Sequence, residues 1–132
     1  MRTVGVDYGE KRIGVAVSDP LGMIAQPVAV AKDIKELVEV IGRYEDVQKI
    51  VVGLPKQMSG GLGIAAQKVL GFVQVLKSLV KAEVVTWDER LTTAEAQKGM
   101  IAAGLSRQDR KKVVDQSAAA IMLQSYLDSK SK

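Results

Sequence analysis

The sequence TVGVDYGEKRIGVAVSD, Thr3–Asp19, contains two short apolar runs on either side of a polar connector. In both runs, apolar residues alternate with small or polar ones, the period of two that is typical of β-strands. We therefore predict strands over residues 2–7 and 12–18. The connector YGEK is short enough to join them as an antiparallel hairpin. A carboxylate, Asp7, stands where the first strand ends, and Gly9 keeps side chains away from it.

Beyond this hairpin, stretches with strand character alternate with stretches of helical spacing. Pro27 places the next predicted strand at an edge of the sheet, because proline cannot donate a ladder hydrogen bond. Asp33 and Thr92 each begin a capping box, with Glu three positions later, which predicts the start of a helix. The further strands are predicted over residues 23–30, 49–55 and 82–87, and the helices over residues 33–41, 65–80, 92–104 and 106–127.

The predicted order, β-β-β-α-β-α-β-α-α, belongs to the α/β class. The first three strands form a meander, and the alternation that follows requires parallel strands joined by right-handed crossovers. The sequence therefore predicts a mixed five-stranded sheet with helices on both faces. A chain of 132 residues suits one domain. We place this domain at residues 1–128, followed by a disordered tail at residues 129–132.

Two absences in the composition exclude whole classes of chemistry. The chain has no cysteine, which excludes disulfides, thiolate metal sites and cysteine nucleophiles. It has no histidine, which excludes a Ser-His-Asp triad and histidine-ligated zinc. Any catalysis must therefore use carboxylates, hydroxyls, Lys, Arg, backbone groups or bound hard metal ions.

Charge and hydropathy bear on partners and location. The formal net charge of +4 and the pI of about 9.4 are compatible with a nucleic-acid partner. No apolar run approaches the roughly 20 residues of a membrane span. Charged residues interrupt the amino-terminal run early, which argues against a signal peptide. We expect a cytoplasmic protein with no membrane association.

Carboxylates are predicted to meet at one edge of the sheet. In open α/β sheets, ligands bind outside the carboxyl ends of the parallel strands. There the first strand ends in Asp7, and the fifth is followed by Asp88 and Glu89. Another carboxylate, Asp115, falls within the apolar arc of the last predicted helix, at about 100° per residue. A carboxylate that faces a core is costly unless it is paired or binds a cation.

Each of these carboxylates also has an alternative structural role. Asp7 alone can cap the hairpin turn, Glu89 can pair with Arg90, and Asp115 can pair with a basic residue of its own helix. Taken together, and without histidine or cysteine, Asp7, Glu89 and Asp115 predict a Mg²⁺ or Mn²⁺ site. Two such ions about 4 Å apart support phosphodiester hydrolysis without a protein general base.

Basic side chains are placed along the chain where they can hold a phosphate backbone beside these carboxylates. The cluster that precedes Asp115 has a solvated helix start as its alternative role. Contacts of this kind give salt-dependent affinity with little base specificity. The predicted nucleic-acid-binding residues are Lys11, Arg12, Lys56, Arg90, Arg107, Arg110, Lys111 and Lys112.

Four motifs, GVDYGEKRIGVAVSD, VVGLP, DERLTT and VDQSAAAIMLQSYL, resemble the YqgF family in order and spacing. This family consists of bacterial RNase H-like proteins, described as pre-16S rRNA nucleases or Holliday-junction-resolvase-like proteins. The resemblance covers about Val4–Asp128. It implies an RNase H-like fold and metal-dependent cleavage of structured nucleic acid, with 5′-end processing of pre-16S rRNA as the leading activity. The acidic positions that it implies as catalytic residues and metal ligands are Asp7, Glu89 and Asp115.

The loop after the fourth strand departs from the family pattern. Where the family commonly has GLPLNMDGSEG, this chain has GLPKQMSGGLG at residues 53–63. The Asn, Asp and Glu of the family become Gln57, Ser59 and Leu62. If those residues help to bind metal or substrate, activity here is weakened or differently tuned. Lys56 adds a positive charge that suits a phosphate.

Three other functions stay open at the level of the sequence. A junction-resolving DNase would use the same carboxylates on branched DNA and act as a symmetric homodimer rather than a monomer. A non-catalytic RNA-binding factor of ribosome biogenesis would bind structured RNA without cleaving it, and the altered loop favours this reading. Nucleotide binding, as in the Asp-Gly hairpin of actin-like kinases, would need a second lobe that 132 residues cannot supply.

Overall fold

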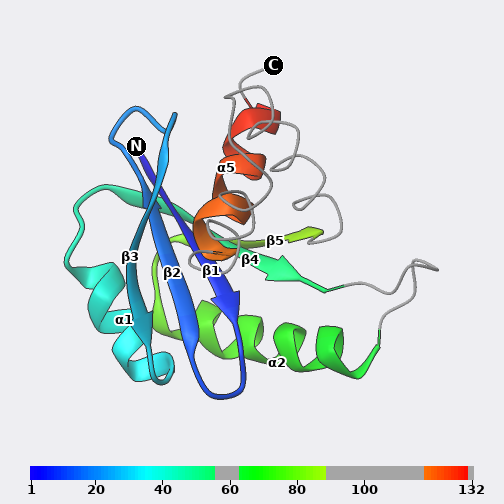
Figure 1. Ribbon diagram of the computed structural model, residues 1–132. Coiled ribbons are helices and arrows are strands. Elements are labelled where there is room, and N and C mark those ends of the chain that lie inside the picture. Colours follow the sequence, from blue (N-terminus) through cyan, green and yellow to red (C-terminus); the bar gives the residue numbers. More distant parts are fainter. Residues whose placement is uncertain (56–62, 89–117, 131–132) are drawn as a thin grey trace.

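The structure of the chain is a computed structural model that describes residues 1–55, 63–88 and 118–130. The described elements form one sheet with helices packed on it (Figure 1). The strands are β1 (Arg2–Tyr8), β2 (Ile13–Ser18), β3 (Ala25–Ala31), β4 (Val47–Leu54) and β5 (Glu83–Asp88), and the helices are α1 (Ile34–Gly42), α2 (Ile64–Leu79) and α5 (Ala118–Lys130).

The five strands lie in the order β3-β2-β1-β4-β5. β1 pairs antiparallel with β2, and β2 pairs antiparallel with β3, so the first three strands form the predicted meander. β4 pairs parallel with β1 and with β5, as the alternation of strands and helices requires. The predicted mixed five-stranded sheet is therefore confirmed, and β1 lies at its centre.

Helices cover both faces of the sheet. α1 and α2 lie on one face, where Ile50 and Val52 of β4 belong to the larger core (Figure 1). α5 lies on the other face, where Val51 of β4 packs with Met122 and Leu123 of α5. Successive residues of β4 thus point to opposite cores, which explains why this strand is continuously apolar.

The packing of α5 on β1 depends on a residue without a side chain. A Cβ atom added to Gly5 would lie 2.7 Å from the Cβ atom of Leu123 and 3.2 Å from the carbonyl oxygen of Ala119. Glycine inside a strand marks places where another backbone comes close. Gly5 therefore sets the distance between α5 and the central strand.

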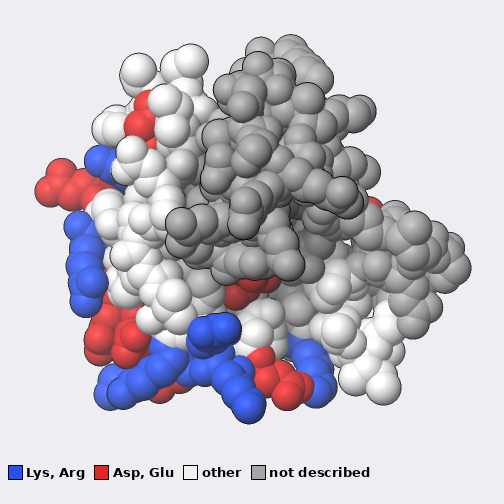
Figure 2. Space-filling model, viewed as in Figure 1, with Lys and Arg blue, Asp and Glu red and all other residues white. Residues whose placement is uncertain are grey.

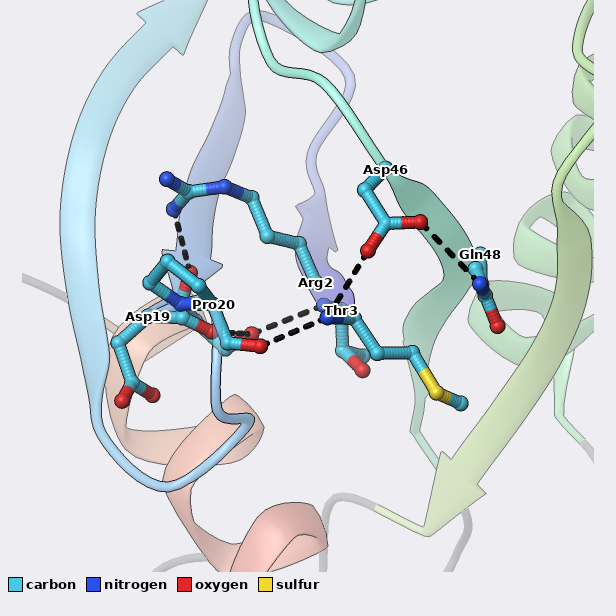
Figure 3. Close-up of polar contacts among 8 residues, drawn as sticks. Arg2, Thr3, Asp19, Pro20, Asp46 and Gln48 are labelled. Carbon is cyan, nitrogen blue, oxygen red and sulfur yellow. Dashed lines mark hydrogen bonds and ion pairs between the residues drawn. The ribbon is translucent and has the colours of Figure 1, made fainter.

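The amino-terminal end of β1 is fastened by polar contacts to the connections on either side (Figure 3). The Arg2 guanidinium donates a hydrogen bond of 3.0 Å to the carbonyl oxygen of Ser18, and the Thr3 amide donates one of 2.9 Å to the Ser18 hydroxyl. The Asp19 carboxylate accepts from the amides of Ile24 and Met23, and these hydrogen bonds lower the pKa of Asp19. The turn after β2 is thereby held against β1.

The local signals are mostly confirmed. Asp33 caps α1, because its carboxylate accepts a hydrogen bond of 2.9 Å from the amide of Glu36. α5 extends to Lys130, whereas the sequence predicts a disordered tail from residue 129. The Ser129 hydroxyl donates to the carbonyl oxygen of Tyr126, and the Lys130 ammonium lies 5.3 Å from the Tyr126 ring centroid, so the last turn has partners. The helix predicted at residues 92–104 lies outside the described residues.

Among residues 1–55, 63–88 and 118–130, no helix is both long enough and apolar enough to cross a membrane.

Replacing Gly5 with alanine should destabilise the protein by about 1–3 kcal/mol, because an overpacked contact forces α5 away from β1. The control is Gly71→Ala in the middle of α2, where an added Cβ meets nothing within 4 Å. This control should stabilise by about 1 kcal/mol, since alanine is the better helix former. Urea unfolding followed by circular dichroism measures both changes. Equal effects of the two substitutions would contradict the packing argument.

Candidate functional site

Asp7 lies near the carboxyl end of β1, on the face of the sheet that α5 covers. Gly5, two positions earlier on β1, faces Leu123 of α5, and side chains two apart on a strand share a face. Asp7 pairs with Gly14 of β2, and a Cβ atom on Gly14 would lie 3.7 Å from the Cβ atom of Asp7. The Asp7 side chain is half-buried. The hairpin therefore presents a carboxylate at the predicted edge.

Asp7 has glycine on its other side as well. Val6 pairs with Val52 of β4, and the next positions along the two strands are Asp7 and Gly53. Gly53 in turn pairs with Trp87 of β5. The carboxylate thus stands between two positions without side chains, which leaves room for a ligand to approach it.

A cavity of about 480 Å³ opens beside Asp7. It lies between the β1–β2 hairpin, the edge strand β3 and the start of α5. Its volume is within the range of pockets that hold small molecules. The lining combines one carboxylate and one guanidinium with small or apolar residues, and it consists of Asp7, Gly9, Arg12, Gly14, Val15, Pro27, Val28, Ala29, Val30, Ala118 and Ala119.

The turn between β1 and β2 carries two of the predicted phosphate-binding residues, Lys11 and Arg12. The Gly9 amide donates a hydrogen bond of 3.0 Å to the carbonyl oxygen of Arg12, which closes the turn. A Cβ atom on Gly9 would lie 2.8 Å from that same oxygen, so the turn itself requires glycine. Lys11 and Arg12 are exposed, and Arg12 also lines the cavity. Gly9 is therefore first a turn residue, in addition to keeping space beside Asp7.

An ion pair fixes this turn against α2. The Lys68 ammonium contacts the Glu10 carboxylate, which lowers the pKa of Glu10 and raises that of Lys68. Figure 2 shows Lys and Arg side chains along the lower edge of the view, where the β1–β2 turn lies in Figure 1, with acidic side chains between them. The surface beside the cavity is therefore of mixed sign.

Asp88 ends β5 at the predicted edge but belongs to the other face. It pairs with Leu54 of β4, and Leu54 packs in the core under α2. Paired residues of neighbouring strands share a face. The register therefore separates Asp88 from Asp7, although both stand at carboxyl ends of strands.

The other predicted site residues lie outside the part of the chain that the structure describes. Within the described part of the chain, no group of three or more Asp, Glu, His or Cys side chains is arranged to hold a metal ion. Of the three predicted ligands, the structure describes Asp7 alone. The residues that lie outside the described ranges are Glu89, Asp115, Lys56, Arg90, Arg107, Arg110, Lys111 and Lys112.

Sequence reasoning did not single out Gly14, which forms part of the cavity floor. A signal was present, because an isolated glycine inside a strand pattern indicates a bulge or a close approach of another group. The residue could have been found on that ground, although not its position opposite Asp7.

The fold is that of the RuvC-like RNase H class. The solved structure of Thermus thermophilus RuvC in complex with a Holliday junction substrate matches with a TM-score of 0.57 and 20% identity, over 99% of this chain and 96% of that chain. A second solved structure of Thermus thermophilus RuvC matches with a TM-score of 0.56 and 16% identity, over 99% of this chain and 96% of that chain. At these identities the likeness concerns the fold alone.

Sequence relatives are closer. The model of the family described as "RuvX: Holliday junction resolvase" matches residues 1–129. A Clostridium acetobutylicum protein named "Putative pre-16S rRNA nuclease" is 50% identical, over 98% of this chain and 99% of its own. A Desulforamulus reducens protein of the same name is 47% identical over the full length of both. The chain belongs to the RuvX/YqgF family, as the resemblance of its motifs predicted.

The Glu10–Lys68 pair predicts a titration that can be observed directly. Because the pKa of Glu10 is lowered in the folded protein, the stabilisation by this pair is complete above the ordinary pKa of 4.5 and is lost as the pH falls through the folded value. NMR of the Glu10 carboxyl carbon should give a midpoint below 4.5, and Lys68→Met should return it towards 4.5. Lys77→Met, at the other end of α2, should leave the midpoint unchanged. A parent midpoint at the ordinary value would contradict the pairing.

Proposed function

We propose that the chain is a divalent-metal-dependent endonuclease of structured nucleic acid, and that its substrate is the 5′ end of pre-16S rRNA. The observation that carries this proposal is the half-buried Asp7 carboxylate in a cavity with Arg12, between two glycines. The names of the relatives support the RNA substrate. The expected cytoplasmic location belongs with the same proposal.

The metal in this proposal is Mg²⁺ or Mn²⁺, held by Asp7, Glu89 and Asp115. Carboxylate oxygens are the ligands that these hard cations prefer, and the chain offers no histidine or cysteine in their place. Glu89 directly follows the last residue of β5, and Asp115 precedes Ala118, which lines the cavity of Asp7, by three positions. These two positions in the sequence favour an arrangement in which Glu89 and Asp115 converge on Asp7. When bound, the metal lowers the pKa of a water molecule and stabilises the leaving oxygen.

Access of the substrate and binding of its phosphates are assigned to residues of the chain itself. The glycines beside Asp7 let a phosphodiester approach the carboxylate without a steric barrier. Arg12 lies on the wall of the same cavity, where its guanidinium can donate to two oxygens of a phosphate in bidentate fashion. Lys11 is exposed on the same turn and adds a long-range attraction. We assign supporting phosphate contacts to the predicted basic residues Lys56, Arg90, Arg107, Arg110, Lys111 and Lys112.

Cleavage of branched DNA is the second candidate, because the matching family model is described as a Holliday junction resolvase. This reaction would use the same carboxylates. It would also require a homodimer, since two strands have to be cut symmetrically. The ratio of cleavage of pre-16S rRNA to cleavage of a four-way DNA junction by the same preparation decides between the two.

Replacing Asp7 with asparagine should lower the rate of metal-dependent cleavage about 100-fold or more, because a lost metal ligand removes several kcal/mol of transition-state stabilisation. The matched control is Asp33→Asn, which makes the same chemical change at the cap of α1. Asparagine caps helices as well as aspartate does, so this variant should cleave like the parent. Gel analysis of a labelled pre-16S rRNA 5′ fragment with Mg²⁺ or Mn²⁺ measures both.

Equal cleavage by the Asp7→Asn and Asp33→Asn proteins would refute the nuclease site. RNA binding by a parent that cleaves nothing under any divalent metal would instead favour the non-catalytic RNA-binding alternative.

Arg12→Ala should weaken RNA binding and reduce the slope of log K against log salt by about 1, since one phosphate contact is lost. Arg43→Ala is the control. Arg43 is exposed and lies between the end of α1 and the start of β4. The start of β4 pairs with the amino end of β1, whereas Asp7 lies near the carboxyl end of β1. Fluorescence anisotropy across a range of salt concentrations gives both slopes. Equal slopes for the two variants would remove Arg12 from the binding surface.

A further inference from the structure

The cavity beside Asp7 continues across β2 to the free edge of the sheet. Gly14 of β2 pairs with Asp7 on one side and with Val30 of β3 on the other. Paired positions share a face, so these residues form a row on the face that α5 covers. Ala118 and Ala119 of α5 line the same cavity. Gly14 is therefore the floor of a groove between Val30 and the start of α5.

The packing of the described residues does not account for a glycine at this position. A Cβ atom on Gly14 would lie 3.5 Å from the Cβ atom of Ala119 and 3.7 Å from that of Asp7, which are ordinary contact distances. Gly5 and Gly9 differ, because a Cβ atom there would collide at 2.7 and 2.8 Å. Gly22 is the described glycine with a positive φ, so the backbone at Gly14 has no need of glycine.

Glycine in a strand interior weakens the strand relative to residues with side chains. Because the described residues do not require a glycine here, the open face of Gly14 leaves room for another group to come close to the strand. The exposed side chain at the rim of the groove supports the same inference. Val30 is an apolar side chain with 63% of its surface exposed, although it stands beside a cavity.

We propose that this groove is the subsite for the nucleotide next to the cleaved phosphodiester, and that Gly14 is its specificity-determining residue. The sugar–phosphate backbone crosses β2 directly over Gly14, from Asp7 towards Val30. The apolar rim contacts the sugar and the base, while Arg12 binds the phosphate. A cavity of about 480 Å³ has the size for one small ligand, so we assign the groove to one strand of the substrate. This inference rests on the proposed function for the identity of the ligand.

The test fills the groove in steps. Gly14→Ala should lower kcat/KM for the labelled pre-16S rRNA 5′ fragment by about tenfold and Gly14→Leu by about a hundredfold, because a displaced phosphate loses its alignment with the carboxylates. The melting temperature of Gly14→Ala should be equal to or above that of the parent, which separates this effect from unfolding. Gly71→Ala is the control, with unchanged kcat/KM.

A second pair of variants covers the case in which Gly14→Leu does not fold. Val30→Glu puts a negative charge on the exposed rim and should also lower kcat/KM by about tenfold, through repulsion of the phosphate. Val75→Glu makes the same change on α2, where 50% of the side chain is exposed, and should have no effect. Cleavage at the parent rate by folded Gly14→Ala and Val30→Glu proteins would overturn the subsite while leaving the nuclease intact.

Binding separates this inference from the proposed function. Affinity for a fluorescent pre-16S rRNA 5′ fragment should fall about tenfold on Gly14→Leu in the Asp7→Asn background, where cleavage is expected to be about 100-fold slower or more. If the parent binds this RNA without cleaving it and Gly14→Leu weakens the binding, the groove stands and the nuclease proposal fails. A parent that neither binds nor cleaves it overturns both.

Discussion

The close approach of α5 to β1 at Gly5 is the constraint on which the rest of the structure depends. The central strand can receive a helix at this distance only because Gly5 leaves room for Leu123. The same approach brings Ala119 beside Gly14 and gives the cavity of Asp7 one of its walls. A packing feature in the middle of the sheet thereby determines the width of the candidate site at its edge.

Local patterns in the sequence were sufficient for most of the fold. The alternating apolar residues of the hairpin and the Asp33 cap act over a few residues, and the structure confirms both. The order of the sheet follows from the alternation of strands and helices. The end of α5 was predicted too early, because the partners of Ser129 and Lys130 in the last turn gave no signal in the sequence pattern.

The candidate site could be predicted only in part, because it depends on register. Asp7 was found from its place at the end of a strand, and the structure puts it in a cavity with Arg12. Asp88 satisfies the same rule, yet its pairing with Leu54 turns it to the opposite face. A shift of one residue exchanges the faces of a strand. The role of Gly14 in the candidate site likewise depends on its pairing with Asp7 of β1, and no pattern within β2 contains that information.

The contact between β5 and α5 has a practical consequence. Trp87 packs edge-on against Tyr126, with ring centroids 5.4 Å apart and an interplanar angle of 86°. Its indole nitrogen is buried, with no hydrogen-bond partner within the described part of the chain. The sequence contains one tryptophan, so all indole emission comes from this contact. Intrinsic fluorescence is therefore a built-in optical reporter of whether α5 is docked on the sheet, without any label near the cavity.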